Sequence, residues 1–196
     1  MTMARESDRA QQMLSAAEAL MRDHRSLGFS LNEVAERVGV TRSLLYAYFD
    51  GVPAILDQIF QDHLQRLEDA IRPIMDGDRP YRDKMVDAYV AYLVYLVEAG
   101  PILQILLRER QQDNPLGEGS RRGFQRFLRY LARHTTRALT LEAREAFVLL
   151  ELNAAIPEAL ARLVRAEEIE MATARDTCSR LISASLDAFA WSDIAA

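Results

Sequence analysis

Apolar residues recur every three or four positions along almost the whole chain, and no stretch shows a sustained alternation of apolar and polar residues. This spacing is typical of amphipathic α-helices and predicts an all-α protein of about nine helices. Glycine and proline separate the apolar segments, which gives the helix boundaries. The expected helices cover residues 8–26, 30–39, 41–50, 53–75, 81–98, 101–113, 120–138, about 140–165, and 168–190.

The segment from Gly28 to Gly51 departs from the long helices of the rest of the chain. Ser30 and Glu33 have the spacing of a capping box, in which each side chain bonds the other residue's backbone N–H. Gly39 ends the short helix, and Thr41 is a suitable N-cap for the next one. Two short helices joined by a tight turn predict a helix-turn-helix, whose second helix enters the major groove of DNA. We expect a three-helix DNA-binding domain over residues 1–52 and a larger helical domain over 53–196.

The run from Gly39 to Phe49, GVTRSLLYAYF, resembles the signature of the TetR family of bacterial transcription repressors. The resemblance covers roughly residues 8–60 and implies a homodimer on a palindromic operator, released by a small-molecule effector. It also implies that Leu45 and Phe49 are core residues. The residues implied to contact DNA are Ser30 and Thr41 at phosphates, Arg42 and Ser43 in the groove, Tyr46 at the backbone or a thymine methyl, and Tyr48 near a phosphate.

Two positions depart from the family's pattern. Leu44 stands where the family usually has a small hydroxyl residue, and Val52 stands where a lysine usually reaches a phosphate. We therefore expect modest affinity and a low salt dependence of DNA binding, or phosphate contacts from elsewhere, for example from Arg5, Arg9 or Arg25.

The charge balance argues against a simple nucleic-acid-binding protein. The net charge is −5, and residues 1–50 contain six arginines against seven aspartates and glutamates. DNA-binding domains are commonly basic, because they neutralise phosphates. This leaves an alternative open, namely a helical small-molecule-binding or protein-interaction protein whose DNA contacts have decayed.

The larger helical domain is expected to bind the effector. A cavity lined by apolar side chains and a few phenol hydroxyls would suit an amphipathic or aromatic molecule. An ordinary packed core explains the same pattern. The candidate lining residues are Met85, Tyr89, Tyr92, Leu96, Leu103, Leu107, Phe127 and Phe147.

A stripe of arginines on the helix expected at 120–138 has two interpretations, a solvated face or a site for an anionic effector. It consists of Arg122, Arg126, Arg129, Arg133 and Arg137.

The last two helices carry small and apolar residues at helical spacing, which suits close packing of helices across a two-fold axis. We expect a homodimer through these helices, as the family resemblance implies, although burial within one chain explains the same residues.

No enzyme motif, metal-ligand spacing or cofactor loop is found, so no catalytic residue, metal or cofactor is expected. The single Cys178, the lack of a long apolar run and the lack of a signal-peptide pattern favour a cytoplasmic protein without a membrane span.

Overall fold

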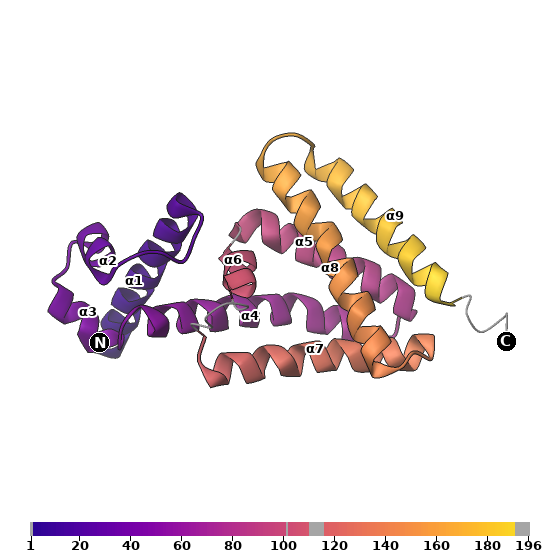
Figure 1. Cartoon of the computed structure of the whole chain (residues 1–196), viewed down its shortest axis with the longest axis horizontal. Helices are drawn as coiled ribbons and strands as arrows, with labels where there is room; N and C mark the ends of the chain where they lie inside the picture. The colour runs from indigo at the N-terminus through magenta and orange to yellow at the C-terminus, as the bar shows by residue number, and fades with distance from the viewer. Residues whose placement is uncertain (1, 101, 110–115, 191–196) are drawn as a thin grey trace. The chain divides into compact units, whose positions relative to one another are not determined.

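The computed structural model describes residues 2–100, 102–109 and 116–190, and for some helix-end residues only the backbone is described. The described residues form nine α-helices and no strand, which confirms the all-α fold with a helix-turn-helix at the N-terminal end (Figure 1). The helices are α1 (Thr2–His24), α2 (Leu31–Val38), α3 (Arg42–Tyr48), α4 (Val52–Asp76), α5 (Tyr81–Ala99), α6 (Ile102–Glu109), α7 (Glu118–Leu139), α8 (Ala143–Arg165) and α9 (Met171–Ala190).

Several helix boundaries differ from the predicted ones. α1 begins at Thr2 rather than at residue 8, and it ends at His24, where Arg25 adopts a positive φ of 52°. Thr140 likewise has a positive φ of 53°, and α8 begins only at Ala143. The left-handed conformation stops an α-helix, and for these non-glycine residues no sequence rule announces it. The end of the helix expected at 101–113 lies outside the described residues.

The chain divides into two compact units, and the division falls inside α4. The N-terminal unit comprises Met1–Leu64 and Pro101–Gly123, and the C-terminal unit comprises Gln65–Gly100 and Phe124–Ala196. The boundary predicted after residue 52 remains a prediction of where the DNA-binding domain ends.

In the N-terminal unit, α1 packs against α2, and α2 packs against α3. α2 and α3 are too short to be stable alone, because isolated helices under about 12 residues are marginal in water. Burial of their apolar sides holds them in place. The central buried side chains of this unit are Met13, Ala17, Met21, Val34, Leu45, Ile55, Ile59 and Phe60.

In the C-terminal unit, α5 packs against both α8 and α9, and α8 packs against α9. Polar contacts also join these helices to one another. The Tyr89 hydroxyl donates to the Leu150 carbonyl at 3.0 Å, and the Arg165 guanidinium donates to the Leu96 carbonyl at 2.7 Å. α8 continues through Pro157, although proline removes one helical hydrogen bond there.

Candidate nucleic-acid interface

α3 has one anchored side and one exposed side. Leu45 is completely buried and Phe49, just after the helix, is also buried, as the family resemblance implied. At the start of α3 the Thr41 hydroxyl accepts the Leu44 N–H at 3.3 Å, which makes Thr41 the predicted N-cap. Arg42, Ser43 and Tyr46 are exposed. The core thus fixes α3 and leaves its donor-bearing side open to solvent.

Arg42 and Tyr46 form a pair on the exposed side of α3. The Arg42 guanidinium donates to the Tyr46 hydroxyl at 3.1 Å, and its central carbon lies 5.4 Å from the centre of the ring. Residues at i and i+4 are neighbours on a helix surface, so the short α3 brings them together. Tyr46 is 48% exposed, and no carboxylate of the described residues pairs with Arg42. The positive charge therefore remains available to an anion.

The capping box at the start of α2 forms as predicted. The Glu33 carboxylate accepts both the Ser30 backbone N–H and the Ser30 hydroxyl at 2.8 Å, and the Glu33 N–H donates to the Ser30 hydroxyl oxygen at 3.3 Å. The Ser30 hydroxyl and then the Ser30 backbone N–H hold the pKa of Glu33 below its ordinary value. This helix start therefore carries a bound carboxylate, and a phosphate approaching Ser30 has to compete with it.

Charges beside α2 are largely neutralised by neighbours. Arg37 pairs with Asp23 at 2.8 Å, and the His24 Nδ1 donates to the Gly28 carbonyl at 2.9 Å. Arg42, like Arg25, has no carboxylate partner among the described residues.

The remaining predicted DNA-binding residues lie close to this side of the domain but differ in exposure. Thr41 and Ser43 are exposed, whereas Tyr48 is half-buried. Leu44 and Val52, the two departures from the family's pattern, are also half-buried. Their apolar side chains add contact area but no hydrogen-bond donor.

The predicted effector-binding residues separate into three groups. Met85, Tyr89, Tyr92, Leu96 and Phe127 are all buried in the C-terminal unit, on α5 and α7. Leu103 is buried in the N-terminal unit, and the side chain of Leu107 lies outside the described residues.

Phe147 does not share this buried environment. It is 45% exposed on α8, on the side opposite the buried Leu149. The apolar spacing on α8 could not show which side of the helix faces α5.

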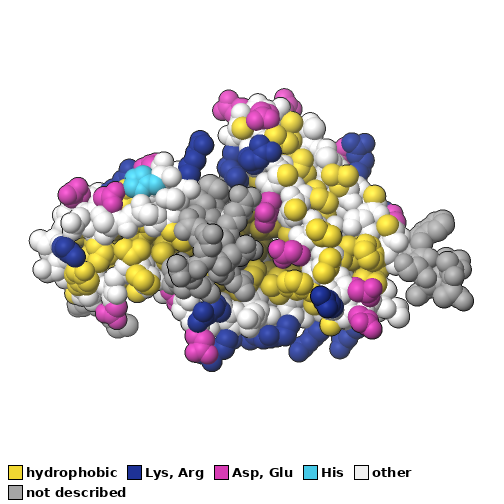
Figure 2. Space-filling view, viewed as in Figure 1, with side chains coloured by type: hydrophobic (Ala, Val, Ile, Leu, Met, Phe, Trp, Pro, Cys, Tyr) yellow, Lys and Arg dark blue, Asp and Glu magenta, His cyan; other side chains and the backbone are white. Residues whose placement is uncertain are grey.

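Exposed apolar side chains gather on α8 and α9, and Figure 2 shows hydrophobic groups over these helices. Leu152 is the most exposed of them, at 66%. The exposed set is Phe147, Val148 and Leu152 on α8, with Leu181 and Phe189 on α9. Other small and apolar residues of these two helices are buried within one chain, among them Leu150, Ala161, Ala174 and Cys178.

The arginine stripe lies on the exposed side of α7, where Figure 2 shows a row of basic groups. Arg122 pairs with Glu118 at 3.2 Å. The stripe is therefore a solvated face with one local ion pair, and it does not line the buried cluster around Tyr89 and Tyr92.

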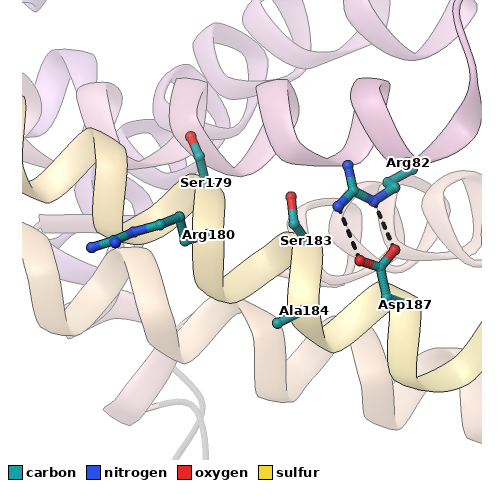
Figure 3. Close-up of a pocket in the computed structure, with 6 residues that line it drawn as sticks. All are labelled: Arg82, Ser179, Arg180, Ser183, Ala184 and Asp187. Atoms are coloured by element: carbon teal, nitrogen blue, oxygen red, sulfur yellow. Dashed lines mark hydrogen bonds and ion pairs between the residues drawn. The ribbon is translucent and has the colours of Figure 1, made fainter.

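A surface pocket that the sequence did not suggest lies between α5 and α9 (Figure 3). It has a volume of about 370 Å³ and is lined by Arg82, Ser179, Arg180, Ser183, Ala184 and Asp187. Arg82 donates to both carboxylate oxygens of Asp187, at 2.7 and 3.0 Å. This bidentate pair occupies the guanidinium and joins the two helices.

Two buried polar features were not foreseen. His63 on α4 lies 3.4 Å from the Glu18 carboxylate on α1, within the N-terminal unit. Asn153 is buried on α8, and its side-chain nitrogen has no hydrogen-bond partner among the described residues. For both residues, the sequence signal for burial was a polar residue at a position where the helical spacing predicts an apolar one.

Over the ranges that the structure describes, no helix has the length and apolar character needed to cross a membrane. Within those ranges no cluster of His, Cys, Asp and Glu could hold a metal ion.

Comparison with known proteins gives a match to one family model over the helix-turn-helix. Residues 13–59 match the model of the bacterial regulatory proteins of the tetR family. No curated protein sequence matches the chain.

Solved structures share the fold over nearly the full chain. A TetR-like transcriptional regulator from Rhodococcus sp. RHA1 has a TM-score of 0.66 and 20% identity, with 94% of each chain covered. The fatty acid degradation regulator FadR from Bacillus halodurans has a TM-score of 0.70 and 16% identity, with 89% of this chain and 94% of that chain covered. A transcriptional regulator of the TerR/AcrR family from Aquifex aeolicus VF5 has a TM-score of 0.66 and 13% identity, with 89% and 98% covered.

These identities are low, so the solved structures establish the fold, whereas the match at residues 13–59 rests on the helix-turn-helix sequence itself. Residues 13–59 therefore match the tetR-family model, and the chain shares its helical fold with solved structures of TetR-like transcriptional regulators.

Proposed function

We propose that this protein is a repressor that binds a palindromic operator as a homodimer and leaves it when a small molecule binds the helical C-terminal unit. The observation that carries the proposal is the exposed side of α3. Arg42, Ser43 and Tyr46 face solvent there, while Leu45 is completely buried beneath them. In a helix-turn-helix this is the side that enters the major groove.

Arg42 supplies the main polar contact in this proposal. A guanidinium can donate two parallel hydrogen bonds to guanine or to a phosphate, which an ammonium group cannot do. The Tyr46 ring beside it restricts the rotamers of the long side chain before DNA arrives. Fewer conformations are then lost on binding, which raises affinity without adding a contact.

A homodimer is required because two-fold operators present half-sites about one helical turn, or roughly 34 Å, apart. The exposed apolar side chains of α8 and α9 support these helices as the interface, since a second copy would remove Phe147, Leu152 and Leu181 from water. A two-fold axis makes each copy bury the same patch.

The effector is proposed to bind among the buried side chains of the C-terminal unit, near Tyr89 and Tyr92 on α5. Release of DNA requires a ligand that binds the DNA-free conformation more tightly than the DNA-bound one. Tight binding to both conformations would leave the operator occupied.

Fluorescence anisotropy with the intergenic DNA beside the protein's own gene tests operator binding. We expect Arg42→Ala to weaken specific binding about 30-fold or more, because losing a contact of about 1–3 kcal/mol in each of two half-sites amounts to about 2–6 kcal/mol for the dimer. Arg129→Ala is the matched control, because Arg129 is also an exposed helical arginine but lies on α7. Both variants should elute as the wild-type dimer in size-exclusion chromatography.

Equal binding of specific and unrelated DNA by the wild-type protein, with no effect of Arg42→Ala, would exclude operator recognition through α3. That result would favour the alternative, a helical small-molecule-binding or interaction protein that no longer reads DNA. The carboxylate held at the start of α2 is the structural feature that favours this alternative.

A further inference from the structure

Asn153 is a buried polar residue at the centre of the apolar side of α8. Its side chain is only 3% exposed, and its Nδ2 has no hydrogen-bond partner among the described residues. The same side of α8 carries the buried residues Ala146, Leu149, Leu150, Pro157, Leu160 and Ala161. More than 90% of buried polar groups in proteins are hydrogen-bonded, because an unpaired one costs about 1–3 kcal/mol. An amide retained at this position therefore calls for a function.

The tyrosines of α5 contact α8 on either side of Asn153. The Tyr89 hydroxyl donates to the Leu150 carbonyl at 3.0 Å, and the Tyr92 hydroxyl donates to the Glu158 carboxylate at 3.2 Å. Both phenol protons are thus engaged with α8, and neither tyrosine pairs with the Asn153 amide. The α5–α8 contact contains one polar donor that the protein itself does not use.

Pro157 adds a second polar group at the same place. Proline has no N–H, so it cannot donate to the carbonyl of residue 153, four positions earlier in α8. Asn153 therefore combines an unpaired side-chain donor with a backbone carbonyl that lacks its usual helical partner.

We propose that Asn153 is the hydrogen-bonding anchor of the effector site, and that its ligand is an uncharged, mostly apolar molecule carrying a hydrogen-bond acceptor such as a carbonyl oxygen. This inference rests on the proposed function, since it names the effector class for the C-terminal unit. The acceptor pairs with Nδ2, and the apolar remainder of the ligand lies against the buried side chains of α5.

The charges around Asn153 disfavour an anionic ligand. Burial above all, and then the carboxylate of Glu158, hold the pKa of Tyr92 well above its ordinary value, and Glu151 acts on Tyr89 in the same direction. A carboxylate ligand would meet this negative field in a poorly hydrated place.

The stability of the ligand-free protein tests whether the amide is unpaired. Replacing Asn153 by leucine of similar size removes an unpaired polar group from an apolar site. We expect Asn153→Leu to raise the melting temperature by about 2 °C or more. Leu149→Asn, which puts an amide at another buried position of α8, is the matched control and should lower it. A lower melting temperature in Asn153→Leu would mean that the amide has a structural partner, and it would overturn the proposal.

Ligand binding tests the anchor directly, with methyl decanoate, decanoate and decylammonium as probes of equal chain length. Isothermal titration should show that methyl decanoate binds the wild-type protein at least tenfold more tightly than decanoate or decylammonium. Asn153→Leu and Asn153→Asp should each lose this binding about tenfold or more, because neither side chain donates a hydrogen bond as its neutral amide does. Equal binding of the three probes, no binding of methyl decanoate, or unchanged binding in the variants would overturn the proposal.

The operator assay separates this inference from the proposed function. If methyl decanoate binds in an Asn153-dependent way but leaves the operator complex intact, the anchor stands and effector release fails. If operator binding is confirmed and methyl decanoate does not bind, the anchor fails and repression by α3 stands.

Discussion

The contributions of Arg42 and Tyr46 to DNA binding, and the coupling between them, can be measured separately. We consider Arg42→Ala, Tyr46→Phe and the double substitution, which together form a double-mutant cycle. Tyr46→Phe keeps the ring that lies 5.4 Å from the guanidinium carbon but removes the hydroxyl that accepts its 3.1 Å hydrogen bond. The cycle therefore gives the coupling energy between Arg42 and the Tyr46 hydroxyl in DNA binding.

The expected coupling energy follows from the exposure of the pair. A hydrogen bond from a charged donor contributes at most about 1.5–3 kcal/mol, and exposure to water reduces that value. We expect about 0.5–1 kcal/mol per half-site, and therefore about 1–2 kcal/mol for a dimer that uses both copies. Such a coupling would make Tyr46→Phe weaken operator binding about 5- to 30-fold, since 1.4 kcal/mol is a factor of ten.

The salt dependence of DNA binding distinguishes the neutralisation of a phosphate by Arg42 from the positioning of Arg42 by Tyr46. Each phosphate neutralised on duplex DNA contributes about −0.9 to the slope of log affinity against log salt concentration. A fourfold rise in salt thus weakens binding about 3.5-fold per phosphate contact, and about 12-fold for the two copies of Arg42 in a dimer. If Arg42 neutralises a phosphate, Arg42→Ala should lower the slope by about 2, whereas Tyr46→Phe should leave it unchanged.

The assay is fluorescence anisotropy of labelled operator at four salt concentrations. They span about 50 to 200 mM, a range over which the affinity of DNA-binding proteins changes measurably. Arg129→Ala serves again as the control and should keep both the slope and the affinity. A Tyr46→Phe variant that binds like the wild type at every salt concentration would refute the positioning role of Tyr46. An unchanged slope in Arg42→Ala together with unchanged affinity would refute the phosphate or base contact itself.

Other predictions concern the supports of the site. Leu45→Ala, which truncates a completely buried side chain under α3, should destabilise the protein by about 2–5 kcal/mol in urea unfolding followed by circular dichroism. Gly39→Ala should cost about 1 kcal/mol in the same assay, because Gly39 has a φ of 74° and a Cβ there would meet no neighbouring atom, so backbone strain is the main penalty. Leu152→Glu on the exposed side of α8 should shift the protein toward monomer in analytical ultracentrifugation, whereas a retained dimer would exclude this side as the interface. Burial raises the pKa of Tyr81 to about 12. The folded state therefore keeps a proton that the unfolded chain loses near pH 10. As a result, the free energy of unfolding should fall by about 1.4 kcal/mol per pH unit between pH 10 and 12. Tyr81→Phe should reduce this alkaline loss in urea unfolding at pH 9 and 11.

The helix-turn-helix could be predicted in detail because its signals are local. The capping box of Ser30 and Glu33, the left-handed Gly39 and the N-cap Thr41 each involve residues within a few positions of one another. Local backbone geometry determines these features, and the rest of the fold needs only to be compatible with them. The pairing of Arg42 with Tyr46 was also open to prediction, because i and i+4 residues meet on any helix.

The C-terminal unit was less predictable because helix periodicity gives an apolar side but not its neighbour. Phe147 and Leu150 both belong to apolar stripes of α8, yet Phe147 is exposed and Leu150 is buried against α5. Which of two apolar sides meets another helix of the same chain depends on packing between segments far apart in sequence. For the same reason, the burial of the Asn153 side chain could not be predicted, because it depends on α5 rather than on the neighbours of Asn153 in the sequence.

Net charge describes the surface around α2 and α3 incompletely, for a physical reason visible there. Two acidic residues near the helix-turn-helix have local partners: Glu33 accepts the Ser30 hydroxyl and Asp23 pairs with Arg37. A carboxylate paired at 2.8 Å projects a much weaker field than a free one, and in physiological salt unpaired charges are screened beyond about 8 Å. What an approaching phosphate meets at α3 is therefore set by Arg42, which no carboxylate holds, rather than by the sum of −5 over the whole chain. The acidic total still has a consequence, since it opposes the long-range attraction to DNA that a basic protein enjoys. We therefore expect recognition to depend on short-range contacts from α3, with slow non-specific association and a small salt slope.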